Sequence, residues 1–265
     1  MPLKLRIVYH VVPDSGALAR RAAEYLVEKT EQIAKSRGQA RIAISGGSTP
    51  KEAFALLADP AQPWRKRMPW DKLELFWVDE RSVPPDHPDS NYRMTREALL
   101  DHVPLKPDQI HRILGELDPA EAAARYEADL KKSFQVDAAG LPRFDLLQLG
   151  IGRDGHTASL FPHSPALTET AHLATANHVA QMNTWRITLT WPVINQAQDV
   201  FFLVGGADKA PILNQVLAGP VDRERLPSQF IVPVSGILTL LLDQAAAALL
   251  PATDAEGRGL LERSL

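Results

Sequence analysis

Short apolar runs alternate with segments of helical periodicity along most of this chain. The strand-like runs lie at residues 3–12, 41–44, 73–78, 144–149, 200–204 and 238–242. The segments with helical spacing lie at residues 15–35, 50–58, 91–101, 119–134, 207–217 and 245–250. Strands that alternate with helices in this way are typical of βαβ units. The pattern therefore predicts an α/β fold of Rossmann-like type, with a mainly parallel sheet and helices on both of its faces.

Two further segments do not fit this alternation. Residues 171–182 and 185–190 follow each other closely and both have strand-like composition, which predicts a small antiparallel β addition. No internal repeat interrupts the chain, and its 21 prolines are dispersed among turns instead of gathered in a linker. We therefore expect residues 1–265 to form a single domain.

Composition narrows the functional classes. The net charge is −3 without a basic block, which argues against nucleic acid as a partner. The most apolar segment, 237–250, is too short to cross a bilayer and contains Asp243 and Gln244. Cysteine is absent, which fits a reducing compartment. We expect a soluble cytoplasmic protein that acts on a small molecule, whereas its oligomeric state cannot be read from the sequence.

A glycine-rich turn follows the second predicted strand. It contains Gly46, Gly47, Ser48 and Thr49, and Pro50 stands where a helix could begin. Glycines allow close backbone approach to an anion, and a helix start offers unpaired N–H groups. The turn therefore predicts a phosphate site, with an ordinary βα turn capped by Ser or Thr as the alternative. It is neither a Walker A loop nor a dinucleotide-binding turn.

Charged side chains gather where the next strands end. Asp79 and Arg81 follow the third predicted strand, and their side chains suit a polyhydroxylated anion. Arg186 and Lys209 stand at later strand ends and could complete an anion site. The alternatives are a solvated loop and isolated surface charges. The acidic residues lack the tight spacing of metal ligands, so we expect no metal.

The segment 150–161 gives the clearest indication of chemistry. It carries Asp154 and His156 in a glycine-rich turn directly after a buried strand. Open α/β sheets bind ligands at this carboxyl edge, and imidazole is well suited to proton transfer near neutral pH. We therefore interpret His156 as a candidate general base with Asp154 beside it. A serine nucleophile is not expected, because the chain has no Gly-x-Ser-x-Gly elbow.

Taken together, these segments resemble the 6-phosphogluconolactonase family, which is related to glucosamine-6-phosphate deaminase. The resemblance covers nearly the whole chain. It rests on the ordered segments 45–50, 79–84, 90–92, 149–162, 186–195 and 205–209. The chain departs from the family pattern at Ile151, where methionine is common, and at His163, where glycine is common. Neither residue has one of the roles that the resemblance implies.

The resemblance implies hydrolysis of 6-phospho-D-glucono-1,5-lactone in the oxidative pentose phosphate pathway, without a metal or an organic cofactor. It implies that His156 activates water, with Asp154 as its partner. The same resemblance assigns the phosphate or the sugar to Ser48, Arg81, Arg186 and Lys209.

Two other functions stay open at this stage. An isomerase or deaminase of amino-sugar phosphates would share these motifs, and Asp79 could then abstract a proton. Such enzymes usually carry a further acid just after the Asp-Gly-His turn, whereas this chain has none before Glu169. The second alternative is a sugar-phosphate sensor fused to a DNA-binding module, for which residues 1–40 leave no room.

Overall fold

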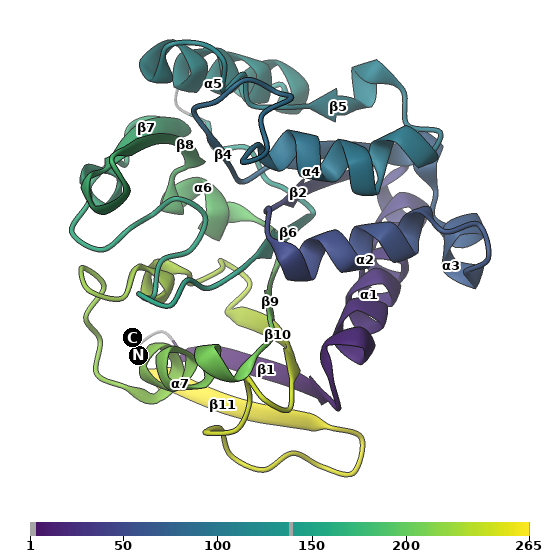
Figure 1. Ribbon diagram of the computed structural model, residues 1–265, viewed down its shortest axis with the longest axis vertical. Coiled ribbons are helices and arrows are strands. Elements are labelled where there is room, and N and C mark those ends of the chain that lie inside the picture. The colour runs from purple at the N-terminus through teal and green to yellow at the C-terminus, as the bar shows by residue number, and fades with distance from the viewer. Residues whose placement is uncertain (1–3, 138–139, 265) are drawn as a thin grey trace.

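The computed structural model describes residues 4–137 and 140–264, and this part of the chain contains two β-sheets (Figure 1). The main sheet has, in spatial order, β11 (Arg258–Ser264), β1 (Lys4–Val12), β10 (Ile237–Asp243), β9 (Asp199–Val204), β6 (Leu146–Leu149), β2 (Ala40–Ile44), β3 (Leu73–Trp77) and β5 (Ile110–His111). All neighbouring pairs are parallel except β1 and β11. The predicted mainly parallel sheet is therefore confirmed, although Leu3, the first residue of the predicted first strand, lies outside the described residues.

The second sheet is small and antiparallel. Its order is β4 (Asp79–Arg81), β8 (Thr184–Leu189) and β7 (Ala174–Val179). β7 and β8 confirm the predicted antiparallel addition. β4 corresponds to residues that the sequence places at the end of the third predicted strand. Nothing there predicts a separate strand, because three polar residues carry no alternation of apolar positions.

Helices cover both faces of the main sheet. They are α1 (Ser15–Arg37), α2 (Ser48–Ala58), α3 (Pro63–Arg67), α4 (Asn91–Ala98), α5 (Pro119–Phe134), α6 (Trp191–Gln196) and α7 (Ala210–Ala218). Figure 1 shows α1 to α4 on one side of the strands and α6 and α7 on the other, as right-handed crossovers running in opposite directions require. The predicted α/β class is confirmed.

The longest helix illustrates how the sequence sets these elements. The side chain of Asp14 accepts a hydrogen bond from the backbone N–H of Ala17 at 2.7 Å and so caps the start of α1. Gly38 ends the helix in the left-handed region, with φ of 81°. Leu18, Ala22 and other apolar residues of one face are buried against the sheet.

The order of the strands reverses between β2 and β6. From β2 the chain continues to β3 and β5, whereas from β6 it continues to β9 and β10 on the opposite side. The connections that leave these two neighbouring strands therefore diverge, and they open a crevice at the carboxyl ends. This is the position at which open α/β sheets bind their ligands.

The carboxyl-terminal part of the chain departs from the prediction. Residues 245–250 form turns instead of the predicted helix. Asp243 holds the first turn, because its Oδ1 accepts the backbone N–H of Ala246 at 2.7 Å. Pro251 follows too soon for a stable helix to develop. Beyond it lies β11, which the apolar pattern did not indicate.

One hydrophobic core cluster includes buried residues from both sheets, and the single-domain organisation of residues 1–265 stays a prediction. Among the described residues, every helix is too short or too polar to traverse a lipid bilayer.

Candidate active site

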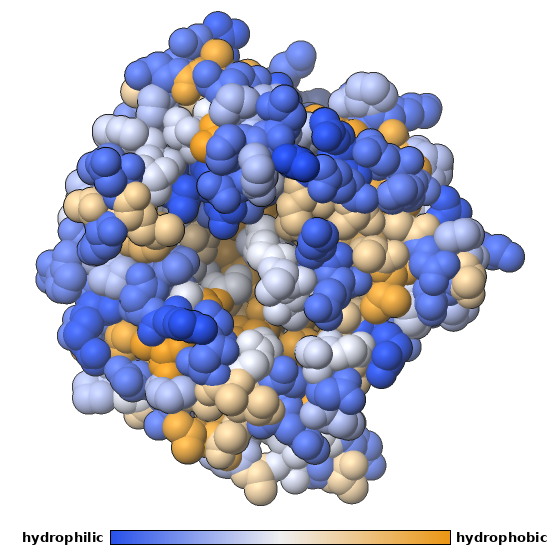
Figure 2. Space-filling view, in the orientation of Figure 1, coloured by the Kyte–Doolittle hydropathy of each residue, from blue (hydrophilic) through white to orange (hydrophobic). Residues whose placement is uncertain are grey.

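A cavity of about 290 Å³ opens at the reversal point between β2 and β6. Figure 2 shows that this face of the molecule is hollowed near its centre and that hydrophilic residues dominate the surface around the hollow. The cavity is lined by Ser45, Gly46, Asp79, Arg81, Asn91, Gly150, Ile151, Gly152, His156, Ala158, Ser159, Phe161, Met182, Arg186 and Lys209. Its volume suits a small ligand.

His156 stands on the floor of this cavity and is fixed from two sides. Its Nδ1 lies 2.5 Å from Oδ1 of Asp154, which also accepts the backbone N–H of His156 at 3.1 Å. The imidazole stacks on Phe161 with ring centroids 4.1 Å apart. Because Asp154 engages Nδ1, Nε2 is the nitrogen left for a ligand. The structure thus brings the predicted pair together, with His156 in the cavity and Asp154 behind it.

The hydrogen bond also affects Asp154. Burial by itself raises the pKa of this carboxyl, but the hydrogen bond and the charge of His156 outweigh burial and lower the pKa below its ordinary value. Asp154 is therefore an ionised acceptor at neutral pH. An ionised acceptor holds the imidazole with its proton on Nδ1 and its lone pair on Nε2.

Gly152 makes room for this pair. A Cβ atom at Gly152 would lie 2.1 Å from Nδ1 of His156 and 2.6 Å from Oδ1 of Asp154. Neither distance is compatible with a side chain, so the turn can hold the pair only with glycine at this position.

Two guanidinium groups face each other on one side of the cavity. Arg81 in β4 and Arg186 in β8 are cross-strand partners. Arg186 is 9% exposed, and within the described part of the chain its guanidinium forms no hydrogen bond or ion pair. Nε of Arg81 is likewise buried without a partner there. Burial, followed by the charge of Arg81, lowers the pKa of Arg186. Like charges placed opposite each other destabilise a sheet, so this arrangement favours an anionic ligand.

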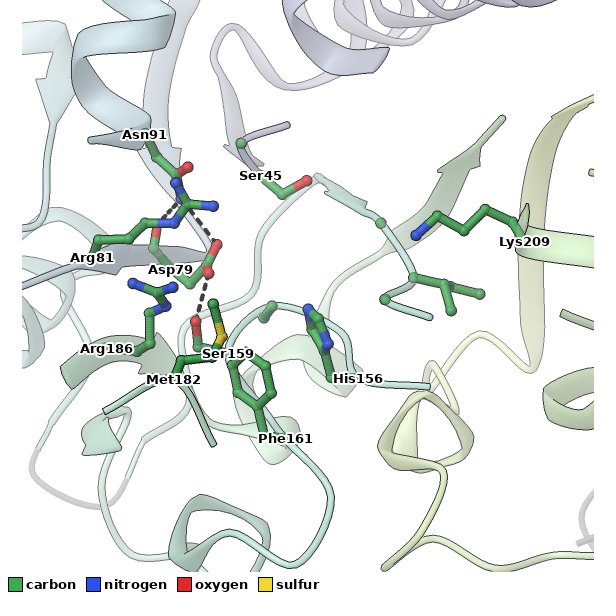
Figure 3. Close-up of a pocket in the computed structure, with 15 residues that line it drawn as sticks. Ser45, Asp79, Arg81, Asn91, His156, Ser159, Phe161, Met182, Arg186 and Lys209 are labelled. Carbon is green, nitrogen blue, oxygen red and sulfur yellow. Dashed lines mark hydrogen bonds between the residues drawn. The ribbon is translucent and has the colours of Figure 1, made fainter. Parts of the chain in front are cut away.

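Asp79 lies beside the guanidinium pair and is itself tied down. Its Oδ2 accepts the hydroxyl of Ser159 at 2.7 Å, and its backbone carbonyl accepts the side-chain amide of Asn91 at 3.0 Å. Asp79 is 7% exposed and lines the cavity. These contacts connect β4, α4 and the loop after His156 at a single point (Figure 3).

The buried carboxylate of Glu80 anchors the start of α4. Its Oε1 accepts the backbone N–H groups of Arg81 and Asn91, at 2.8 and 2.7 Å. Its Oε2 accepts the hydroxyl of Ser90 and the backbone N–H of Tyr92, at 3.0 and 2.8 Å. Burial raises the pKa of Glu80, and these four hydrogen bonds counteract part of that rise. Glu80 thereby fixes the backbone that carries Arg81 and Asn91 into the cavity.

The glycine-rich turn is only partly in the cavity. Gly46 lines it, and a Cβ atom there would lie 1.8 Å from Oδ1 of Asn91. Gly47, Ser48 and Thr49 are not among the lining residues, and Ser48 is the first residue of α2. The cap of α2 is Gly47, and no side chain caps it. The alternative of Ser or Thr capping is therefore wrong, and the amino-terminal end of α2 keeps free N–H groups next to the cavity.

Lys209 reaches the cavity from the side opposite the guanidinium pair (Figure 3). Its Nζ lies 3.9 Å from Oδ2 of Asp208, whose carboxylate also pairs with Nε of Arg153 at 2.7 Å. The Arg153–Asp208 pair links the turn that carries His156 to the segment that carries Lys209. The structure thus gathers Asp79, Arg81, Arg186, Lys209 and His156 around one space, as the sequence predicted.

Sequence reasoning missed several lining residues. Asn91, Ser159, Phe161 and Met182 were not singled out as site residues, although the first three lie in the segments that carry the family resemblance. Met182 is 56% exposed at the rim, between β7 and β8. Nothing in its own sequence context distinguishes it from a surface loop residue.

The residues that could hold a metal do not converge. Over residues 4–137 and 140–264, no three His, Cys, Asp or Glu side chains form a group with the geometry of a cation site.

Comparison with known proteins agrees with the motifs. A sequence profile described as "Glucosamine-6-phosphate isomerases/6-phosphogluconolactonase" matches residues 13–240. The chain is 43% identical over 239 residues to a 6-phosphogluconolactonase of Nostoc sp., covering 90% of this chain and 96% of the relative. It is 43% identical over 242 residues to one of Synechocystis sp., covering 91% and 98%. The solved structure of 6-phosphogluconolactonase from Trypanosoma cruzi superimposes with a TM-score of 0.79 at 30% identity, over 95% of this chain and 99% of that one.

Proposed function

Because the chain belongs to the glucosamine-6-phosphate isomerase/6-phosphogluconolactonase family, we propose that it is a carboxylic ester hydrolase. Its substrate is 6-phospho-D-glucono-1,5-lactone and its product 6-phospho-D-gluconate. The names of the similar proteins support this reaction. The observation that carries the proposal is His156, held by Asp154 in a cavity that also collects three cationic side chains.

The chemistry begins at Nε2 of His156. This nitrogen removes a proton from a water molecule that attacks C1 of the lactone, and the charge of Asp154 stabilises the imidazolium that forms. A lactone carbonyl is reactive, so general-base assistance of about 10²–10⁴-fold is a substantial part of the catalysis needed. No covalent intermediate is required.

The tetrahedral intermediate then needs donors for its negative oxygen. Backbone N–H groups of the turn at residues 150–156 are the candidates. Collapse of the intermediate breaks the bond between C1 and the ring oxygen. The imidazolium of His156 returns its proton to that oxygen, which restores the base for the next turnover.

The phosphate of the substrate is far from C1 and serves for positioning. We assign it to the Ser48 turn at the start of α2 together with Arg81, Arg186 and Lys209. Free N–H groups at a helix start and cationic side chains both favour a dianion. Binding energy at this distance orients the lactone ring over His156.

The isomerase or deaminase alternative is less well supported. Asp79 lies in the cavity, where it could act on a sugar carbon. However, it already accepts hydrogen bonds from Ser159 and Asn91. Asp79 is the one carboxylate among the described lining residues, so a second acid for ring opening is missing from this part of the chain.

The test follows the loss of freshly prepared 6-phosphogluconolactone, corrected for its spontaneous hydrolysis. We expect enzyme-dependent hydrolysis that strongly prefers the phosphorylated lactone over glucono-1,5-lactone. Release of ammonia from glucosamine 6-phosphate, without lactone hydrolysis, would instead establish the alternative.

The proposal requires neither a metal nor an organic cofactor. Treatment with a chelator should therefore leave the rate unchanged. The cytoplasmic location and the place of the reaction in the oxidative pentose phosphate pathway are parts of the same proposal.

A further inference from the structure

Ser45 and Gln148 form a buried reciprocal contact under the cavity. The backbone N–H of Ser45 donates to Oε1 of Gln148 at 3.0 Å, and Nε2 of Gln148 donates to Oγ of Ser45 at 2.8 Å. Gln148 is 0% exposed and Ser45 6%. Ser45 follows β2 and Gln148 lies in β6, so the contact joins the two strands at the reversal point.

The direction of the Gln148 amide is fixed by its neighbours. The backbone N–H of Ser45 can only donate, so the atom that faces it must be the amide oxygen. On the other side, Nε2 lies 3.3 Å from the carbonyl oxygen of Leu149, which can only accept. Both contacts place Nε2 toward Oγ of Ser45.

This direction determines what the Ser45 hydroxyl can do. Its oxygen accepts from Gln148, so its own proton is free to donate elsewhere. Within residues 4–137 and 140–264 that proton has no acceptor. Ser45 lines the cavity, and Figure 3 shows its hydroxyl between the Asp79–Asn91 side of the cavity and Lys209. The hydroxyl is therefore a donor presented to the ligand.

We propose that the Ser45 hydroxyl donates to a phosphoryl oxygen of the substrate and that Gln148 is the positioning residue that directs this proton. The inference rests on the proposed function and extends it by two residues outside the predicted site. Ser45 directly precedes the turn that leads to α2, where free N–H groups favour an anion. A hydrogen bond to a charged oxygen is stronger than one to a sugar hydroxyl.

The first test replaces the hydroxyl alone. In Ser45→Ala we expect KM for 6-phosphogluconolactone to rise at least about ten-fold, with kcat changed less than about two-fold. The inhibition constant of inorganic phosphate should rise in parallel, whereas KM for glucono-1,5-lactone should rise much less than KM for the phosphorylated lactone. Ser45→Thr keeps a hydroxyl and should recover most of the lost affinity. Ser36→Ala, at an exposed serine of α1, is the matched control.

The second test addresses Gln148. Gln148→Leu removes the amide that directs the hydroxyl, so KM should rise in the same way. In the Ser45→Ala background the same substitution should add less than about two-fold, because its effect passes through Ser45. Urea unfolding establishes that each variant is folded, and the Ser45 variants test the donor even where Gln148→Leu does not fold.

Several outcomes would overturn the inference. An unchanged KM in Ser45→Ala would exclude the hydroxyl as a donor, and an equal loss with both lactones would exclude the phosphoryl group as its acceptor. Additive effects of the two substitutions would exclude positioning by Gln148. Failure of the lactonase proposal is distinguishable, because the wild-type protein would then lack turnover altogether.

Discussion

At the scale of single residues, His156 depends on neighbours that leave one of its nitrogens available. Asp154 binds Nδ1 and Phe161 covers one face of the ring. A general base needs this combination of fixed orientation and an accessible lone pair.

Removal of the imidazole should therefore affect the chemical step. In His156→Ala we expect kcat to fall about 10²–10⁴-fold, while the product 6-phosphogluconate still binds. Stopped assays of lactone loss and calorimetric titration with the product measure the two effects. His178→Ala, an exposed histidine in β7, serves as the control. Undiminished turnover by His156→Ala would show that His156 is not the general base.

Gly152 provides an indirect test of the same pair. A methyl group there would displace His156 or Asp154, so Gly152→Ala should lower kcat by at least about ten-fold while the protein stays folded. The control is Gly16→Ala in α1, where the added Cβ would lie 3.4 Å from its nearest neighbour, Asp14. Full activity of Gly152→Ala would contradict the prediction, because it would show that His156 and Asp154 keep their positions beside an added methyl group.

The residues that line the cavity differ in how far the sequence alone predicts that they lie close together. Asp154 and His156 stand two residues apart in one turn, so their proximity is a local property of the sequence. Asn91 and Ser159 reach Asp79 from separate elements. Their proximity depends on tertiary packing, which hydrophobic periodicity does not encode.

At the scale of elements, β4 is short and charged, yet Asp79 and Arg81 of this strand line one side of the cavity. It lacks the apolar alternation by which strands are recognised, and instead it is held by pairing with β8 and by Glu80. The helix expected at 245–250 fails for the opposite reason. Its composition is apolar, but Asp243 and Pro251 confine it to turns. Pairing with a distant strand accounts for the first case, and the turn held by Asp243 together with Pro251 accounts for the second.

Glu80→Gln tests this anchoring. A carboxamide can accept through only one oxygen, so in either orientation its NH₂ group would face at least one backbone N–H that now donates to Glu80. We expect a loss of about 2–4 kcal/mol in the free energy of unfolding and a higher KM, because Arg81 and Asn91 would shift. The exposed Glu52→Gln is the matched control. Urea unfolding at neutral pH measures the difference, and equal stabilities would refute the anchoring role.

The same carboxyl predicts a pH dependence. The pKa of Glu80 is raised in the folded state, so above the ordinary glutamate range the folded chain binds more protons than the unfolded chain. Its contribution to stability is then largest at acidic pH and declines as the pH rises through the raised pKa. Unfolding curves measured between about pH 4.5 and about pH 8 should show this decline in the wild type. In Glu80→Gln the part of this pH dependence that comes from the Glu80 carboxyl should be absent.

At the scale of the whole molecule, the cavity collects residues from both sheets and from both halves of the chain. Ligand binding should therefore stabilise the fold as a unit. At roughly 100-fold over its Kd, 6-phosphogluconate should add about 2.7 kcal/mol, or about 5–10 °C in Tm. His156→Ala should retain this shift, whereas Arg186→Ala should lose most of it at the same concentration. Equal shifts in both variants would exclude Arg186 from the anion site.

The paired guanidiniums of Arg81 and Arg186 should make ligand binding sensitive to the small anions of the medium. Guanidinium groups in proteins keep their protons, and the carboxylate of Asp79 offsets only part of the repulsion within this pair, so binding of an anion relieves the rest. Sulfate, inorganic phosphate and other small anions of the medium will therefore compete for the resting protein. Substrate entry becomes an exchange of one anion for another, and measured affinities will depend on the choice of buffer as much as on the sugar.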